Sequence, residues 1–192
     1  MDGTLIDSGT CVERQWARWA QRHGLDLDDV MRLSHGRRTI ETMLALTPHL
    51  EQPLELERFL AEEAADLEDI SPFEGAREFL DSLPPDRWAI VTSSSQTVAR
   101  ARLRHCAFPE PRVLVAADHV AHGKPHPEPY LTAARLLGHR PEDCIVVEDA
   151  NSGIAAARAA GMRVVGVAWA REPLDCETQI RRFRDLRVQF TR

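Results

Sequence analysis

Short apolar runs alternate with amphipathic segments over most of the second half of this 192-residue chain. The apolar runs predict strands at residues 88–91, 112–116, 144–147 and 163–168. Helical spacing of apolar side chains predicts helices at residues 75–83, 96–106, 128–137 and 153–160, a further helix near 176–183, and a last short strand near 187–190. Strands that alternate with helices favour a parallel sheet covered on both faces, so we expect an α/β fold.

Residues 11–70 break this alternation, because they indicate helices alone. Helices are expected at residues 11–23, 38–46 and 54–67, the first ending at Gly24, where a C-terminal cap would fall. We therefore expect an α/β core built from residues 1–10 and 71–192, with residues 11–70 inserted as a helical cap. Insertions above the mouth of a sheet often act as lids.

Composition excludes several classes of protein. The net charge of −6 argues against binding to nucleic acid, which requires a basic surface. No apolar run has the length of a membrane span, and no basic-then-apolar signal segment opens the chain, so a cytoplasmic protein is expected. The four cysteines are scattered without a CxxC pair, and His122 and His126 are interpreted as loop residues because prolines adjoin them.

Polar or charged side chains follow two of the predicted strands, and a single lysine lies in the loop before the predicted helix at residues 128–137. Ser93 and Ser94 follow residues 88–91 after Thr92 and suit a phosphate at a helix start, although taken alone this stretch favours an ordinary helix cap. Glu148 and Asp149 follow residues 144–147, where two adjacent carboxylates favour a hard cation or form a surface turn. Lys124, the only lysine beside 23 arginines, offers a compact ammonium for an anionic group or is simply exposed.

Together these groups form a pattern that none of them establishes alone. The carboxyl ends of parallel strands meet at one edge of a sheet, which would bring the hydroxyls, the ammonium and the acid pair together. Phosphoryl transfer depends on such positioning and charge neutralisation. The sequence therefore predicts a phosphoryl-transfer site at this edge.

The same motifs resemble those of the haloacid dehalogenase (HAD) superfamily, in the branch with a small helical cap. Its opening motif is an apolar run followed by Asp-x-Asp-Gly-Thr-Leu-x-Asp-Ser, and DGTLIDS at residues 2–8 matches its second part. Ser93, Lys124 in GKPHPEPY, and Glu148 with Asp149 in VVEDANSGIAAARAAGM match the other three motifs. The resemblance covers nearly the whole chain and implies a Rossmann-like parallel sheet core with an inserted cap.

The resemblance also implies roles for individual residues. In the family, a first aspartate attacks phosphorus, and a second, matched by Asp2, protonates the leaving alcohol and then activates water. Ser93 and Lys124 would hold the transferred phosphoryl group. A Mg²⁺ ion would be held by the first aspartate, the backbone carbonyl of Asp2 and the acid pair, with Asp149 the more direct ligand. The remaining expected phosphate- or substrate-binding residues are Thr4, Ser94, Asn151 and, from the cap, His35, Arg37 and Arg38.

One part of the family pattern lies outside the sequence. The first aspartate would directly precede Met1, on a strand expected between residues 88–91 and 144–147 in the middle of the sheet. Loss of such a strand would leave buried backbone groups unpaired, each costing roughly 1–3 kcal/mol. We therefore favour a true start about ten residues upstream, a strand's length, over a truncated and inactive relative.

Three functions remain open at this stage. The first is a Mg²⁺-dependent phosphatase for a small phosphorylated sugar or polyol, acting through an aspartyl-phosphate and expected to be a monomer. The second is a sugar phosphate mutase similar to β-phosphoglucomutase, which shares all four motifs. The third is a non-catalytic protein that binds a phosphorylated ligand.

Overall fold

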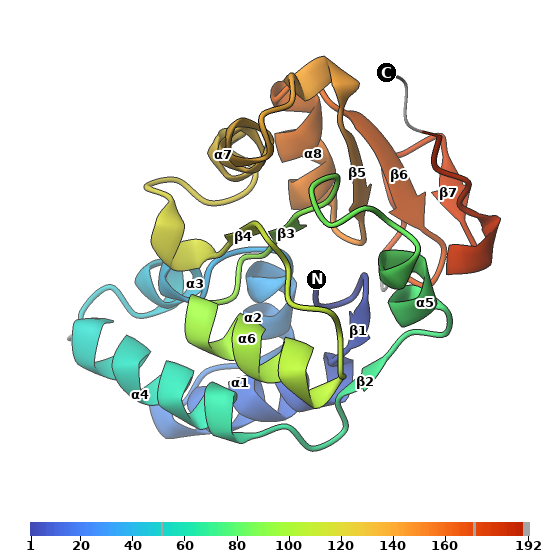
Figure 1. Ribbon diagram of the computed structural model, residues 1–192. Helices are drawn as coiled ribbons and strands as arrows, with labels where there is room; N and C mark the ends of the chain where they lie inside the picture. The colour runs from blue at the N-terminus through green and yellow to red at the C-terminus, as the bar shows by residue number, and fades with distance from the viewer. Residues whose placement is uncertain (51, 171, 190–192) are drawn as a thin grey trace.

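A computed structural model of the chain describes residues 1–50, 52–170 and 172–189. It is an α/β protein in which helices surround short, mostly parallel strands, so the predicted fold class is confirmed. In Figure 1 the helices of the first third of the chain gather at one end of the molecule, and the longest strands lie side by side at the other.

The strands form three separate groups. An antiparallel pair joins β1 (Ile6–Asp7) to β2 (Ser71–Pro72). A parallel pair joins β3 (Ile90–Val91) to β4 (Leu114–Val115). The third group is parallel and runs β5 (Ile145–Glu148), β6 (Arg163–Val167), β7 (Gln179–Ile180).

Helices cover both faces of this sheet, as the alternating side chains of its strands require. Val146 packs against α7 (Glu128–Leu137) and α8 (Asn151–Ala159). Its neighbour Val147 packs on the opposite face, in the core that includes α5 (Ala76–Asp81) and α6 (Gln96–His105). Val146 and Val147 are therefore covered on opposite faces of the strand, as in a parallel sheet, whereas Ile145 remains 48 % exposed.

A second hydrophobic core lies among the helices that connect β1 to β2. These helices are α1 (Gly9–His23), α2 (Leu27–Ser34), α3 (Thr39–Leu46) and α4 (Gln52–Ala65). Trp19, Met43 and Phe59 are buried together there, and Gly24 ends α1 in the left-handed conformation. The sequence predicted three of these helices but not α2. The division into core and cap stays a prediction.

The main sheet is interrupted between β3 and β5. Within residues 1–50, 52–170 and 172–189, β3 pairs only with β4, and the only strand paired with β5 is β6. Figure 1 shows β3 and β5 as the facing edges of the two parts of the sheet. The interruption falls where the sequence predicts a further strand.

Two elements near the C-terminus differ from the sequence-based predictions. The prediction of a helix at residues 176–183 is wrong, because Gln179 and Ile180 form β7 and a single 3₁₀ turn follows at Phe183–Asp185. Ala168 donates a 2.8 Å backbone hydrogen bond to Ile180, so pairing with β6 overrides the local helical pattern. The strand expected near residues 187–190 is absent from 187–189, and residue 190 lies outside the described residues. In the part of the chain that the structure describes, we find no helix of the length and apolarity that a membrane span requires.

Candidate active site

A cavity of about 410 Å³ opens beyond the carboxyl ends of β3 and β5. Strand β3 leads directly into Ser93 and Ser94, and β5 ends at Glu148. Most of the residues singled out from the sequence lie in its wall, namely Asp2, His35, Arg37, Ser93, Ser94, Lys124, Glu148 and Asp149. The parallel topology thus brings together groups that are up to about 150 positions apart in the chain.

Glu148 is fully occupied by hydrogen bonds and is 3 % exposed. Its Oε1 accepts from the Lys124 ammonium and, at 2.9 Å, from the Tyr130 hydroxyl. Its Oε2 accepts from the backbone N–H groups of Asp149 at 2.6 Å and Ala150 at 3.0 Å. Burial alone would raise the pKa of this carboxyl, but the Lys124 charge and these donors hold it below its usual range. Glu148 is therefore ionised and anchors Lys124 at the cavity.

Asp149 has fewer partners than Glu148. Its Oδ1 accepts a 2.6 Å hydrogen bond from the Thr4 hydroxyl. Burial and the neighbouring charge of Glu148 raise the pKa of Asp149 to about 6. Gly3 has a φ of +71°, and a Cβ at this position would overlap the Asp149 carboxylate, so the carboxylate lies directly against the backbone of the Asp2–Gly3 turn.

This arrangement fits a hard cation. A buried carboxylate with a raised pKa is stabilised in its ionised form by a positive charge. Asp149 presents oxygen atoms only, next to the backbone of Asp2 and Gly3, and oxygen is the donor that Mg²⁺ prefers. The residues present are thus suited to the metal that the family resemblance implies.

Asp2 is held by three side-chain donors. Ser8 donates at 2.9 Å and Arg102 at 2.8 Å to Oδ1, and Ser94 donates at 3.1 Å to Oδ2. Burial would raise the pKa of Asp2, but the Arg102 guanidinium, the N-terminal ammonium and the hydroxyl donors together lower it. Its carboxylate is therefore occupied by these donors, and the backbone that lies against Asp149 is that of the next residue, Gly3.

The loop after α2 lies against the mouth of the cavity. The Ser93 hydroxyl donates to the backbone carbonyl of Gly36 at 3.0 Å, and Ser152 donates to the same oxygen at 3.3 Å. His35 and Arg37 flank Gly36 and line the cavity, with Arg37 exposed. The inserted helices therefore contact the site through this loop.

Comparison with known proteins identifies the family of this chain. The model of the haloacid dehalogenase-like hydrolase family matches residues 1–167. The chain belongs to this family. It is 42 % identical over 172 residues to hexitol phosphatase A of Escherichia coli, which covers 87 % of this chain and 80 % of that protein. It is 32 % identical over 189 residues to the fructose-1-phosphate phosphatase YqaB of Escherichia coli, covering 87 % and 93 % of the two chains.

Solved structures share this fold. A hydrolase from Pseudomonas syringae superposes with a TM-score of 0.81 at 23 % identity, covering 93 % of this chain and 89 % of the other. A β-phosphoglucomutase-like protein from Thermotoga maritima gives a TM-score of 0.67 at 29 % identity, covering 94 % and 91 %. The expected HAD fold and family are confirmed, and with them the expected enzyme class, a phosphoric monoester hydrolase.

Three of the expected phosphate- or substrate-binding residues of this HAD protein lie outside the cavity wall. The Thr4 hydroxyl is bound to Asp149. Arg38 pairs with Glu41 at 2.6 Å and donates to the backbone carbonyl of Val120 at 3.2 Å. The Asn151 amide donates to the carbonyl of Pro173 at 2.9 Å, and its oxygen accepts from the backbone of Asp175 at 2.8 Å. Their assignment to the substrate stays a prediction.

Sequence reasoning missed Arg102 and Glu63, which extend the site of this HAD protein into its inserted helices. Arg102 is 1 % exposed and donates at 3.0 Å to Glu63 on α4, on the side opposite Asp2. The signal was present in α6, where Val98, Ala99 and Leu103 form the apolar stripe and Arg102 falls within it. A charged residue in an apolar stripe indicates a buried ion pair.

Proposed function

We propose that this protein is a Mg²⁺-dependent phosphatase that acts on a small phosphorylated sugar or polyol. The observation that carries the proposal is the convergence of Ser93, Lys124 and Asp149 on one cavity at the carboxyl ends of β3 and β5. Its named relatives, a hexitol phosphatase and a fructose-1-phosphate phosphatase, support the class of substrate.

The side chains present divide the work of such a reaction. When substrate binds, the Ser93 hydroxyl exchanges its hydrogen bond to the Gly36 carbonyl for one to a phosphoryl oxygen. Lys124 neutralises part of the charge of the phosphoryl group from its fixed position on Glu148. Asp2 gives a proton to the leaving alcohol and later takes one from the attacking water. Its lowered pKa favours the second of these tasks.

Mg²⁺ would be held by Asp149 together with the backbone carbonyl of Asp2, with Glu148 behind them. When bound, it would neutralise charge on the phosphoryl oxygens. Glu148 contributes mainly through Asp149, since all of its hydrogen bonds go to Lys124, Tyr130 and backbone amides.

The nucleophile in this proposal is an aspartate directly upstream of Met1, which forms an aspartyl-phosphate during the reaction. The interruption between β3 and β5 supports it, because one further parallel strand there would present its last residue at the cavity. Intact mass and N-terminal sequencing of the protein from its own cell test this part. An aspartate before Met1 supports the proposal, and a chain that starts at Met1 favours the binding protein instead.

We further propose that α1–α4 form the cap, residues 11–70, and that His35 and Arg37 contact the substrate from it. Their positions beside Gly36, which Ser93 contacts, support this role. We also propose that the enzyme is monomeric and cytoplasmic.

Release of inorganic phosphate tests the proposal, with the protein as its own cell produces it. Hexitol phosphates, fructose-1-phosphate and glycerol-1-phosphate are assayed with Mg²⁺ and again with excess EDTA. Release that EDTA abolishes is the expected result. Interconversion of phosphate isomers without release would favour the mutase, and stabilisation by a ligand without any turnover would favour the binding protein.

A further inference from the structure

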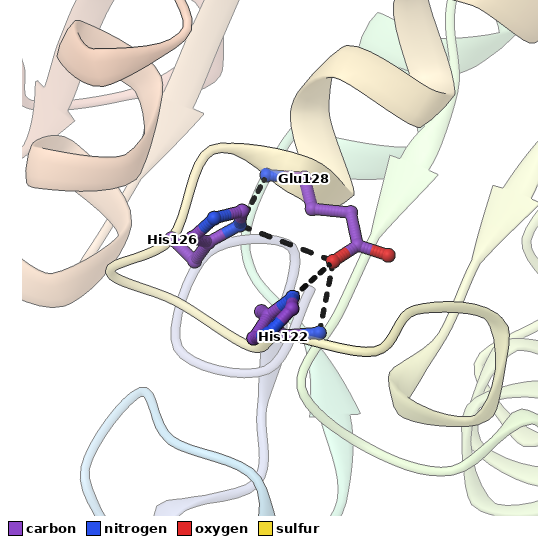
Figure 2. Close-up of side chains that lie close together, drawn as sticks. All are labelled: His122, His126 and Glu128. Carbon is purple, nitrogen blue, oxygen red and sulfur yellow. Dashed lines mark hydrogen bonds and ion pairs between the residues drawn. The ribbon is translucent and has the colours of Figure 1, made fainter.

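A cluster of two imidazoles and one carboxylate lies on the surface beside the Lys124 loop, apart from the cavity. His122, His126 and Glu128 each offer one ligand atom, and these atoms lie within 4.8 Å of one another. The two rings face the Glu128 carboxylate in Figure 2. Among the described residues, this cluster is the only group of three or more histidine, cysteine or acidic side chains whose ligand atoms lie this close together.

The distances suit a small cation with nitrogen and oxygen ligands. His122 Nδ1 lies 2.9 Å from Glu128 Oε2, and His126 Nδ1 lies 3.9 Å from the same oxygen. Ligands bound tetrahedrally at about 2.0–2.1 Å from a zinc ion are about 3.3–3.4 Å apart, a value between the two distances. A shift of about half an ångström in each ring would bring both distances to this value. His126 Nδ1 would then exchange the 3.2 Å hydrogen bond that it accepts from the Glu128 N–H for the metal, with the fourth position left to water.

The carboxylate is already oriented and ionised. Glu128 accepts backbone hydrogen bonds from Ala121 at 2.8 Å and His122 at 2.9 Å. These two amides, with the His122 ring, lower the pKa of Glu128 to about 2. Such a carboxylate needs no rearrangement and no loss of a proton to bind a metal, and Pro125 and Pro127 limit the freedom of the loop.

The surroundings allow an ion to enter from solvent. The side chains of His122 and His126 are 67 % and 51 % exposed. Two nearby cations are already neutralised, because Lys124 is bound to Glu148 and Arg38 to Glu41. The cluster is therefore accessible and carries a net negative charge when its imidazoles are neutral.

We propose that His122, His126 and Glu128 form a binding site for one divalent cation of the zinc class, separate from the Mg²⁺ site. Two imidazoles and a carboxylate select Zn²⁺, Ni²⁺ or Co²⁺ over Mg²⁺, which takes oxygen ligands. The three ligands lie on both sides of Lys124, so the bound ion clamps the loop that carries it.

The test is calorimetric titration of the EDTA-treated and dialysed protein with Zn²⁺ in buffer that contains excess Mg²⁺. One equivalent of Zn²⁺ should bind, and His122→Ala and His126→Ala should each weaken binding at least about tenfold. His105→Ala, an exposed histidine at the end of α6, is the matched control and should bind as the parent does. Zn²⁺ should also slow amide hydrogen exchange in residues 121–128 of the parent but not of His126→Ala.

Cobalt distinguishes this cluster from the free thiols, which also bind zinc. Co²⁺ should give the visible spectrum of a four-coordinate nitrogen and oxygen site, without a thiolate charge-transfer band. Unchanged Zn²⁺ affinity in the His122→Ala/His126→Ala double variant, or a thiolate band with Co²⁺, would overturn the proposal. So would the absence of Zn²⁺ binding by the folded parent protein.

Discussion

The Arg102 guanidinium lies 2.8 Å from Asp2 Oδ1 and, on its other side, 3.0 Å from Glu63 Oε1. A single buried cation therefore joins the first turn of the chain to helix α4 of the inserted segment. Removal of one member of a buried ionic group leaves the others uncompensated, which costs about 3–5 kcal/mol. The interaction couples the position of Asp2 to the packing of α4.

Replacement of Arg102 tests this coupling. We expect Arg102→Met to lower the free energy of unfolding by about 3–5 kcal/mol, because Asp2 and Glu63 would remain buried without a counter-charge. Arg104→Met, on the exposed side of the same helix, should change it by less than about 0.5 kcal/mol. Urea unfolding measures both, and equal values for the two variants would show that the buried cation contributes nothing.

Gly3 provides a test of the turn between Asp2 and Asp149. A methyl group at Gly3 would overlap the Asp149 carboxylate, and its φ of +71° also strains an alanine. Gly3→Ala should reduce phosphatase activity at least about tenfold, which corresponds to about 1.4 kcal/mol of transition-state stabilisation. Gly24→Ala is the control, because Gly24 has a similar φ of +64° but nothing within 4 Å of its Cβ position. It should cost about 1 kcal/mol of stability and leave activity unchanged; comparable activities in the two variants would contradict the proposed role of the turn.

Lys124 tests whether the site requires a compact ammonium. The side chain is buried against Glu148 and lies over the ring of Tyr130, 5.2 Å from the centroid. Lys124→Arg keeps the charge but needs more space, so we expect a loss of kcat of at least about tenfold. Tyr130→Phe, which removes only one hydrogen bond to Glu148, should cost about 1–3 kcal/mol of stability with a smaller loss of kcat. Turnover by Lys124→Arg at the rate of the parent would show that the site does not require a lysine at this position.

The junction after α4 makes stability depend on pH. Arg14 donates to both oxygens of Asp66, at 3.1 Å and 2.8 Å, and this lowers the pKa of Asp66 below its ordinary value of 3.8. A lowered carboxyl pKa stabilises the folded state fully above about pH 4, and the contribution is lost as pH falls through the folded value. Asp66→Asn should therefore be less stable by about 1 kcal/mol at pH 7, with a difference that narrows in acid. Asp86→Asn, an exposed residue, is the control, and thermal unfolding from pH 7 to pH 2.5 measures both; a pH-independent difference would contradict the assignment.

Much of the fold followed from the sequence because its pattern is local. The helix predicted at residues 128–137 has the same bounds in the structure, since its apolar stripe lies within it and the Gly138 cap follows it directly. The helix expected at residues 176–183 failed because Ile180 is fixed by β6, more than ten residues away. Periodicity within a short segment carries no information on such a partner.

In the candidate site, too, some residues could be predicted from the sequence and others could not. Ser93, Lys124 and Asp149 each follow an apolar run or a Gly-Pro-rich loop, so their convergence could be predicted from the strand order alone. Arg102 and Glu63 could not be paired in advance, because they lie on helices whose relative placement depends on packing. His122 and His126 were interpreted as loop residues, which they are, but the turn that brings their rings to 4.6 Å also depends on the Glu128 backbone contacts.

Asp149→Asn gives the most direct measurement of the central claim, that this cavity hydrolyses phosphate monoesters with the help of Mg²⁺. The parent is the protein with the upstream strand and nucleophile present, and both variants are made in that background. Phosphate release from a hexitol phosphate is measured against Mg²⁺ concentration for the parent, for Asp149→Asn and for Asp143→Asn, whose side chain is 66 % exposed. We predict that Asp149→Asn loses at least about a hundredfold in rate, and that Asp143→Asn behaves as the parent does. Full Mg²⁺-dependent activity in Asp149→Asn would place the chemistry elsewhere and contradict the account.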